Sequence, residues 1–229
     1  GSSEWTRRRE IDLSSCDLSF SDVRSLANFL LKRPNQLTSL RLSDNLLGDE
    51  SGELLGILLE ELDLRQLDLS NNDLTTTGLR AFACQGGKLE SLSVGGNDLS
   101  DAADELVELL GRSDSLRHLD ISNVGLETQD VKKIAEAVRA RRSLQSLVLD
   151  DNDCASSLLL FADCTHLSSL SVRNTGLNDD SCVRFCRQLA MGGSRRLKLD
   201  CRGNKMCTDK SRSAMMGAEK LVRGFEYKM

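Results

Sequence analysis

The stretch LRQLDLSNNDL, from Leu64 to Leu74, places leucines at positions 64, 67, 69 and 74 and an asparagine at position 72. The same pattern, L-x-x-L-x-L-x-x-N-x-L, starts again 25 residues later as LESLSVGGNDL, and it also occurs earlier, as LTSLRLSDNLL from position 37. A period of about 20–50 residues is the sequence signature of proteins built from stacked, similar units. The pattern therefore predicts a repeat architecture.

Eight copies of this pattern follow one another along the chain, 23 to 29 residues apart. The first and the last copy are degenerate, with Arg8 and Arg196 in place of their first leucine. A single copy could belong to an ordinary core, whereas eight in succession indicate a fold. We call the position of the recurring asparagine the ladder position. In chain order it holds Cys16, Asn45, Asn72, Asn97, Val124, Asn152, Thr175 and Asn204.

The two central leucines of each copy predict a short strand with one buried face. Side chains alternate along a strand, so these leucines project to one side and their neighbours to the other. After each turn the apolar period changes to that of a one-faced helix, as at Val131, Ile134, Ala135 and Val138. The asparagine of the turn can satisfy backbone groups that have no strand partner. Stacking would then bury each apolar face against the next copy.

The repeat resembles that of the leucine-rich repeat family, and its length resembles the intracellular, ribonuclease inhibitor-like class, whose units pair a strand with a full helix. The resemblance covers nearly the whole chain. It implies an α/β solenoid shaped as a horseshoe arc of about eight repeats, with a parallel sheet on the concave face and helices on the convex face. It implies little about the biological role, because one scaffold serves many partners in this family.

We expect residues 1–229 to form a single leucine-rich repeat domain. The opening Gly1-Ser2-Ser3 resembles a tag remnant, so residues 1–7 are interpreted as this remnant and a possible N-terminal cap that includes Trp5. The repeats occupy residues 8–206. Apolar residues at helical spacing between Ser213 and Tyr227 predict a helix within residues 207–229 that caps the last repeat.

Two copies depart from the ladder rule in the same way. In SNVGL and RNTGL the ladder position holds Val124 or Thr175, the asparagine stands one place earlier, and a glycine follows. Because glycine permits backbone angles closed to other residues, we infer an alternative loop shape at both places. Neutral drift and a functional role are equally compatible with it. The sixth copy is also short, which leaves little room for a helix between positions 156 and 164.

Composition and charge disfavour several other classes of protein. The 30 lysines and arginines against 35 aspartates and glutamates give a net charge of −5, the wrong sign for attracting a nucleic acid. Aromatic residues make up 3% and there is a single proline, which disfavours a β-sandwich or β-barrel. No run of 18 apolar residues occurs, so no membrane-spanning helix is expected.

The eight cysteines indicate structural thiols. Cys16, Cys154 and Cys201 occupy positions of the repeat pattern, and Cys182 falls on an apolar helix face. The pairs at 182 and 186 and at 201 and 207 lack the two-residue gaps usual for zinc ligands, so no metal site is expected. No Asn-x-Ser or Asn-x-Thr glycosylation site is present, and no cysteine precedes Cys16. These features favour a reducing, cytoplasmic location.

The sequence contains no motif that indicates catalysis or a cofactor. The only two histidines, His118 and His166, are not accompanied by a nucleophile motif. The Gly-Gly pairs at positions 86, 95 and 192 lack the surroundings of a phosphate-binding loop. We therefore expect a domain that is not an enzyme, with no catalytic, cofactor-binding or metal-binding residues.

The strand residues that are not leucine predict the surface that would meet a partner. Small polar residues dominate it and acids predominate at the position between the two leucines. Such a shallow polar face suits a basic or extended protein segment, although an inert, solvated sheet face is the simpler interpretation. The residues expected to contact a partner on the concave face are Asp12, Arg41, Gln66, Asp68, His118, Asp120, Val148, Asp150 and Arg173.

The sequence favours a non-catalytic protein–protein interaction scaffold with a polar, mildly acidic concave face, forming one domain of a larger protein or assembly. One alternative is a GTPase regulator, because the Ran GTPase-activating protein is similar at the level of the fold. Another is a substrate-adaptor or sensor repeat domain separated from its effector domain. No residue here matches a functional position of that GTPase-activating protein. The identity of the partner, the pathway and the oligomeric state stay undetermined by the sequence.

Overall fold

The computed structural model describes residues 8–32, 36–192, 196–205 and 207–229. The possible cap around Trp5, and position 206 of the last copy, lie outside these residues. Internal contacts divide the chain into a first unit, Gly1–Arg117, and a second unit, His118–Met229. Within each unit, short strands alternate with helices, which confirms the predicted α/β repeat.

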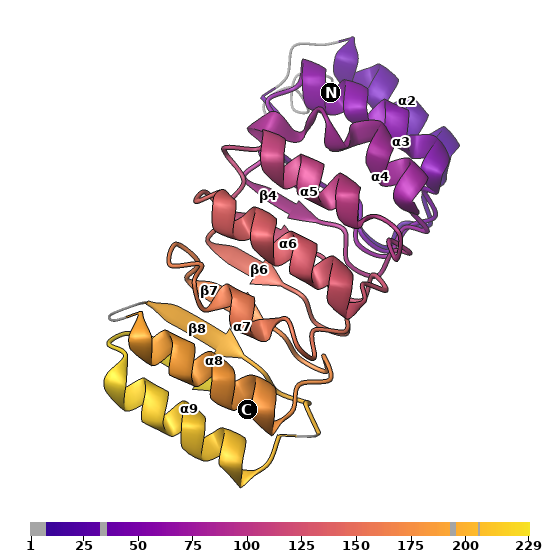
Figure 1. Ribbon diagram of the computed structural model, residues 1–229. Coiled ribbons are helices and arrows are strands. Elements are labelled where there is room, and N and C mark those ends of the chain that lie inside the picture. The colour runs from indigo at the N-terminus through magenta and orange to yellow at the C-terminus, as the bar shows by residue number, and fades with distance from the viewer. Residues whose placement is uncertain (1–7, 33–35, 193–195, 206) are drawn as a thin grey trace. The chain divides into compact units, whose positions relative to one another are not determined.

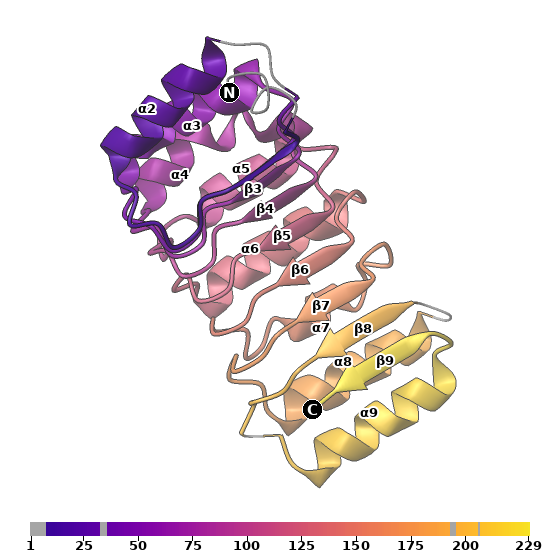
Figure 2. The ribbon, with the colours of Figure 1, turned by 180° about the vertical axis from the view of Figure 1, so that it is seen from behind.

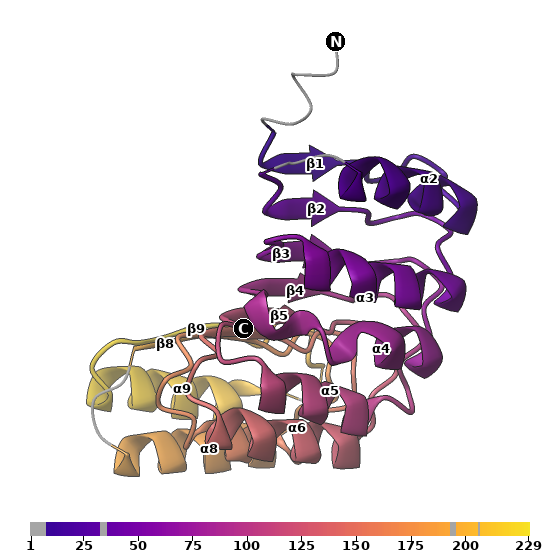
Figure 3. The same ribbon diagram turned by 90° about the horizontal axis from the view of Figure 1, so that it is seen from above.

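The strands and helices of the first unit form two layers. Seen from above in Figure 3, strands β1 to β4 lie on one side and helices α2, α3 and α4 on the other. The elements are β1 (Glu10–Asp12), α2 (Phe20–Leu31), β2 (Ser39–Arg41), the 3₁₀ helix η1 (Asp49–Ser51), α3 (Gly52–Glu61), β3 (Gln66–Asp68), α4 (Thr76–Ala83), the 3₁₀ helix η2 (Gly86–Lys88), β4 (Ser91–Ser93) and α5 (Ala103–Arg112).

The second unit repeats the arrangement and ends on a strand. Figure 1 shows its helices, and Figure 2 shows its strands from the opposite side. The elements are β5 (His118–Asp120), α6 (Thr128–Ala140), β6 (Ser146–Val148), α7 (Leu158–Phe161), β7 (Ser169–Ser171), α8 (Asp179–Met191), β8 (Leu197–Asp200), α9 (Asp209–Leu221) and β9 (Phe225–Lys228).

All strands of a unit pair in parallel and in sequence order, β1 to β4 in the first unit and β5 to β9 in the second. The register places corresponding leucines side by side, so that Leu40, Leu67 and Leu92 form one column. These side chains are buried, as are the apolar positions of the helices. The core of each unit therefore lies between its strand layer and its helix layer, and no helix among the described residues is both long and apolar enough to cross a membrane.

The ladder asparagines of the even-numbered repeats join repeats in pairs. Asn97 donates from Nδ2 to the carbonyl of Leu69 at 2.9 Å, and its Oδ1 accepts the N–H groups of Asn72 at 2.9 Å and Leu74 at 3.0 Å. All four even repeats show this arrangement with the repeat before them. Their ladder residues are Asn45, Asn97, Asn152 and Asn204.

The odd-numbered repeats have a different turn, which explains the two exceptions in the sequence. The residue after the ladder position has a positive φ only there, at Asp17, Asp73, Gly125 and Gly176. This conformation turns two backbone N–H groups toward the next asparagine. No pair of backbone N–H groups is directed at the ladder residue of an odd repeat, so the apolar Val124 can occupy this position. At the same position of the third repeat, the Oδ1 of Asn72 is buried without a hydrogen-bond partner. The alternative loop shape inferred at positions 124 and 175 is confirmed, and the first and third repeats share it.

The C-terminal end differs from the prediction. A helix was expected to reach Tyr227, but α9 ends at Leu221, and Phe225–Lys228 forms a ninth strand that pairs with β8. Gly224 has a φ of 88° and allows the chain to turn back toward the sheet. Phe225 is buried and packs against Phe185, with ring centroids 6.5 Å apart. The short helix expected in the sixth copy is confirmed as α7.

Candidate functional site

The outward side chains of the strands form one polar surface on each unit, which we call the strand face of that unit. Leucines and their equivalents occupy the inward positions of β1–β8 and are buried. Of the outward positions within β1–β9, all are polar or charged except Val148, which is half-buried. An extended, preformed surface of this kind is how repeat proteins meet their partners.

Charged groups on the strand face of the first unit are partly paired with each other. Arg41 lies 3.1 Å from the carboxylate of Glu10 and 3.7 Å from that of Asp12. Asp68 has no cation among its recorded contacts in the described part of the chain, and Gln66 is exposed. Three carboxylates against one guanidinium leave this face with a net charge of 1 − 3 = −2.

The aspartates between the two strand leucines also serve their own backbone. Asp12 and Asp68 each accept the N–H of the serine two residues later at 3.0 Å, and Asp120 accepts that of Ser122 at 2.9 Å. The hydrogen bond from the Ser14 backbone, above all, holds the pKa of Asp12 below its usual value. The recurrence of these aspartates therefore has a structural cause in addition to any role in binding.

Asp150 does not lie where a partner-binding residue is expected. It is only 2% exposed, and its carboxylate accepts hydrogen bonds from Ser171 Oγ at 2.6 Å, from the Arg173 backbone at 2.8 Å and from Arg173 Nε at 2.7 Å. The side-chain hydrogen bond to Asp150, above all, and the charge of that carboxylate raise the pKa of the Arg173 guanidinium. Asp150 thus positions Arg173, whose guanidinium stays half-exposed. The expectation of a surface carboxylate at this position is wrong, because the next repeat folds over it.

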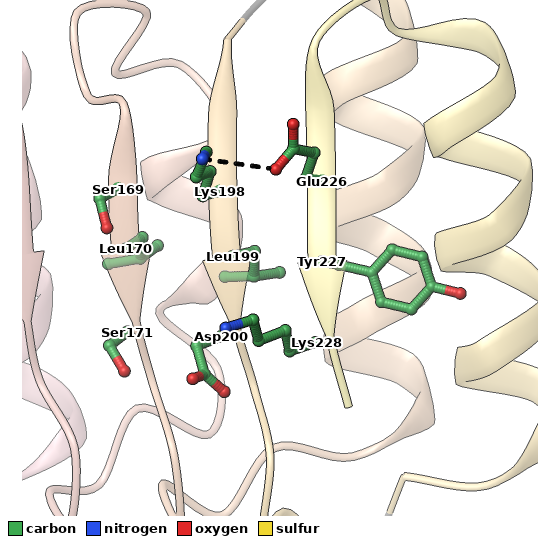
Figure 4. Close-up of a pocket in the computed structure, with 9 residues that line it drawn as sticks. All are labelled: Ser169, Leu170, Ser171, Lys198, Leu199, Asp200, Glu226, Tyr227 and Lys228. Atoms are coloured by element: carbon green, nitrogen blue, oxygen red, sulfur yellow. Dashed lines mark ion pairs between the residues drawn. The ribbon is translucent and has the colours of Figure 1, made fainter.

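Strands β7, β8 and β9 enclose a shallow groove of about 330 Å³ on the strand face of the second unit. In Figure 4 the side chains of Lys198 on β8 and Glu226 on the adjacent β9 face each other, and the distance between their charged atoms is 3.6 Å. Asp200 and Lys228 line the other end. The Asp200 carboxylate lies 2.6 Å from Nη2 of Arg202. The side-chain hydrogen bonds from Arg202, above all, lower the pKa of Asp200.

Sequence reasoning missed two charged residues of this face, Glu226 and Lys228. Glu226 and Lys228 belong to β9, which was read as part of a helix. The alternation of Phe225 and Tyr227 with polar neighbours was the available signal for a strand. When Asp150, Arg173 and Arg202, which follow strands, are counted with the outward strand residues, the second unit has four cations and four carboxylates here, 4 − 4 = 0. The predicted acidic excess therefore belongs to the first unit.

The cysteines and histidines of the described residues differ in their exposure. Cys154, Cys182, Cys186 and Cys201 are buried, whereas Cys16 and Cys84 are exposed. His118 is exposed on the strand face. Within the described ranges, no three of His, Cys, Asp and Glu come together in a way that could hold a metal ion.

Comparison with known proteins follows the fold. The Leucine Rich repeat family model matches residues 35–56 and 59–83. Mouse ribonuclease inhibitor is 28% identical over 196 residues, which cover 81% of this chain and 37% of the inhibitor. Human NACHT, LRR and PYD domains-containing protein 13 is 28% identical over 158 residues, which cover 62% of this chain and 15% of that protein. The chain thus spans less than half of these relatives.

Two solved structures share the fold. The leucine-rich repeat-containing protein LegL7 from Legionella pneumophila aligns with a TM-score of 0.61 and 20% identity, covering 95% of this chain and 72% of that one. A chain in the yeast Rad7 and Elc1 complex aligns with a TM-score of 0.54 and 18% identity, covering 90% and 60%. Fold and strand faces define a protein-interaction repeat domain. The repeat pattern, the family model and these relatives together support a leucine-rich repeat domain similar to the ribonuclease inhibitor-like class.

Proposed function

We propose that this domain is a non-catalytic scaffold whose strand faces bind a protein partner. The observation that carries the proposal is the composition of the outward strand positions, which are polar at every place except Val148. Since the strands are fixed by parallel pairing and by the buried leucines, binding would order few groups and would cost little conformational entropy.

The charges favour different partner segments on the two units. The strand face of the first unit carries a net charge of −2 and suits a basic segment. The strand face of the second unit balances its charges and presents Arg173 and Arg202 beside each other at the strand ends, where a carboxylate of the partner could accept their free N–H groups. Each face therefore favours its own kind of segment, a basic one on the first unit and one that offers carboxylates on the second.

Relatives support a binding role of this kind. Ribonuclease inhibitor is named for its action on another protein, and Rad7 was solved in a complex with Elc1. Because this chain spans only part of the relatives it matches, we infer that it acts as one domain of a larger protein or assembly. We propose a cytoplasmic location because the buried cysteines are free thiols, which are typical of proteins in reducing compartments.

A paired charge experiment tests the proposal. The strand-face variant Asp68→Asn with Asp120→Asn removes two carboxylate charges but keeps the Oδ1 acceptors that bind Ser70 and Ser122. The helix-face variant Glu53→Gln with Glu136→Gln removes the same charge from exposed positions on α3 and α6. Wild type and both variants are immobilised, and proteins captured from an extract of the native cell are quantified by mass spectrometry.

We expect at least one protein whose capture falls about fivefold or more with the strand-face variant and stays unchanged with the helix-face variant, since each surface charge contributes up to about 1 kcal/mol. Urea unfolding of both variants checks that the fold is kept. The proposal fails if every captured protein is retained equally by the two variants, or if the helix-face variant alone loses them.

A further inference from the structure

Two thiols of the second unit lie next to each other although they are 25 residues apart in the sequence. Cys182 lies in the first turn of α8, and Cys207 lies two residues before α9. Their sulfur atoms are 3.4 Å apart, and both cysteines are free. A disulfide bond has a length of about 2.05 Å, so the two sulfurs need to approach by little more than 1 Å.

The surroundings hold these two segments in place. Asp179, the first residue of α8, accepts the backbone N–H of Thr208 at 2.9 Å and its hydroxyl at 2.6 Å. Its carboxylate also accepts the N–H of Ser211 at 3.1 Å. The N-terminal ends of α8 and α9 are therefore tied together beside the thiols, and a disulfide would add a covalent bond to a contact that already exists.

Neighbouring sulfurs are directed elsewhere. Cys186 Sγ lies 3.4 Å from the Sδ of Met215, and Cys201 Sγ donates to the Lys228 carbonyl at 3.1 Å. Cys84 and Cys16, the exposed cysteines, contact a glutamate and a serine carbonyl instead of another thiol. Of the described cysteines, only 182 and 207 have a recorded contact between two Sγ atoms.

From this geometry we infer that Cys182 and Cys207 are an oxidisable pair that closes into an intramolecular disulfide when the protein meets a hydroperoxide. Cys207, which is partly exposed, attacks the peroxide as a thiolate. Its sulfur becomes a sulfenic acid, and the peroxide oxygen–oxygen bond breaks to release one alcohol or water. Cys182 then attacks that sulfur, the S–S bond forms and water leaves. Two thiols lose two electrons, and one hydroperoxide gains them.

The difference in burial assigns the order of these steps. Cys182 is fully buried, and desolvation is the main cause that raises its pKa well above the usual value. It therefore stays a protonated thiol at neutral pH and does not meet the oxidant first. Once Cys207 is oxidised, its sulfur atom is the electrophile that the Cys182 thiol can reach without leaving the core.

Mass spectrometry of the whole domain after treatment with hydrogen peroxide tests the inference. We expect the protein to lose two hydrogen atoms, to fall from eight to six titratable thiols, and to yield a peptide that joins positions 182 and 207. Reduction by dithiothreitol should restore all eight thiols. Hydrogen exchange in the first turn of α9 should be slower in the oxidised than in the reduced protein.

Two variants supply the matched comparison. Cys207→Ser should lose the joined peptide, and Cys84→Ser, which removes an exposed thiol of the first unit, should keep it. If Cys207→Ser does not fold, as judged by circular dichroism, the peptide map of the wild type decides by itself. The inference is overturned if the main product joins another pair, such as 201 with 207, or if Cys207 is oxidised to sulfinic acid while Cys182 stays a thiol.

Discussion

At the scale of single residues, the ladder position has two different environments. In even repeats a buried asparagine satisfies two N–H groups and a carbonyl of the repeat before it, together with carbonyls of its own turn. In odd repeats the same position holds Cys16, Asn72, Val124 or Thr175, and no pair of N–H groups is directed at it. The functional unit of the ladder is therefore a pair of repeats.

This difference predicts unequal costs for two similar substitutions. Asn97→Val removes four strong hydrogen bonds and leaves the N–H groups of Asn72 and Leu74 buried without partners, each at about 1–3 kcal/mol. We expect a loss of about 3 kcal/mol or more in the free energy of unfolding. Asn72→Thr, which places the residue of the seventh repeat in the third, should cost about 1 kcal/mol. Urea denaturation measures both, and equal costs would contradict the paired ladder.

Asp179 predicts a dependence of stability on pH. Hydrogen bonds from the side chains of Ser211 and Thr208, and from the Thr208 backbone, hold its pKa well below the usual value. Because its pKa is lowered in the folded state, Asp179 makes its full contribution to the free energy of unfolding above the unfolded-state pKa of about 3.9. This contribution is lost as the pH falls toward the folded-state pKa. Asp179→Asn should therefore be less stable than wild type at pH 7, with a gap that narrows below about pH 4.

The control for this prediction is Asp180→Asn, which changes the adjacent carboxylate. The contact recorded for the Asp180 carboxylate among the described residues is an exposed ion pair with Arg184 at 2.9 Å, so its loss should change stability little at any pH. Urea midpoints from pH 7 to pH 3 give both curves. A gap for Asp179→Asn that stays constant over this range would show that its hydrogen bonds do not depend on the charged form.

At the scale of elements, helices α3 and α4 approach each other over glycines. A Cβ atom at Gly52 would lie 2.6 Å from the Gly78 carbonyl oxygen and 2.8 Å from the Ala81 side chain. Because one of these neighbours is backbone, the helices would have to move apart. Gly111, in α5 of the same unit, has open space in this direction.

Gly52→Ala should therefore lower the free energy of unfolding by about 1–3 kcal/mol through overpacking. Gly111→Ala should leave it unchanged or raise it by up to about 1 kcal/mol, since alanine favours the helix. Thermal or urea unfolding of both variants measures the difference. Stabilisation by Gly52→Ala would mean that α3 and α4 pack less closely than these distances indicate.

Elements were predictable to different degrees. The positions of β1 to β8 follow from the leucine spacing, because a strand with one buried face needs period two. Strand β9 was not predicted, since Ala214, Ala218, Leu221 and Phe225 also fit a helical period and the turn at Gly224 is decided by the docking of Phe225 on Phe185. The difference between odd and even turns depends on a positive φ after the ladder position. At Asp17 and Asp73 no glycine marks this conformation in the sequence.

At the scale of the whole molecule, the fold was predictable because each repeat buries its leucines in the same way, between its strand and its helix. The location of the strand faces followed from the same period. Their chemistry was predictable only in part. Asp150 is covered by the next repeat, Asp12, Asp68 and Asp120 bind their own turns, and Glu226 and Lys228 come from an unexpected strand. Such contacts depend on neighbours that the sequence does not place.

The central claim is that the strand face, and not the helix layer, contacts the partner. A photo-crosslinking residue in place of Val148, on the strand face of β6, tests it against the same residue in place of Gln129, exposed on α6. Both positions belong to the second unit, so expression and folding are matched. After irradiation in the native cell, position 148 should give a discrete crosslinked protein and position 129 should not. Crosslinks from position 129 alone would contradict the account.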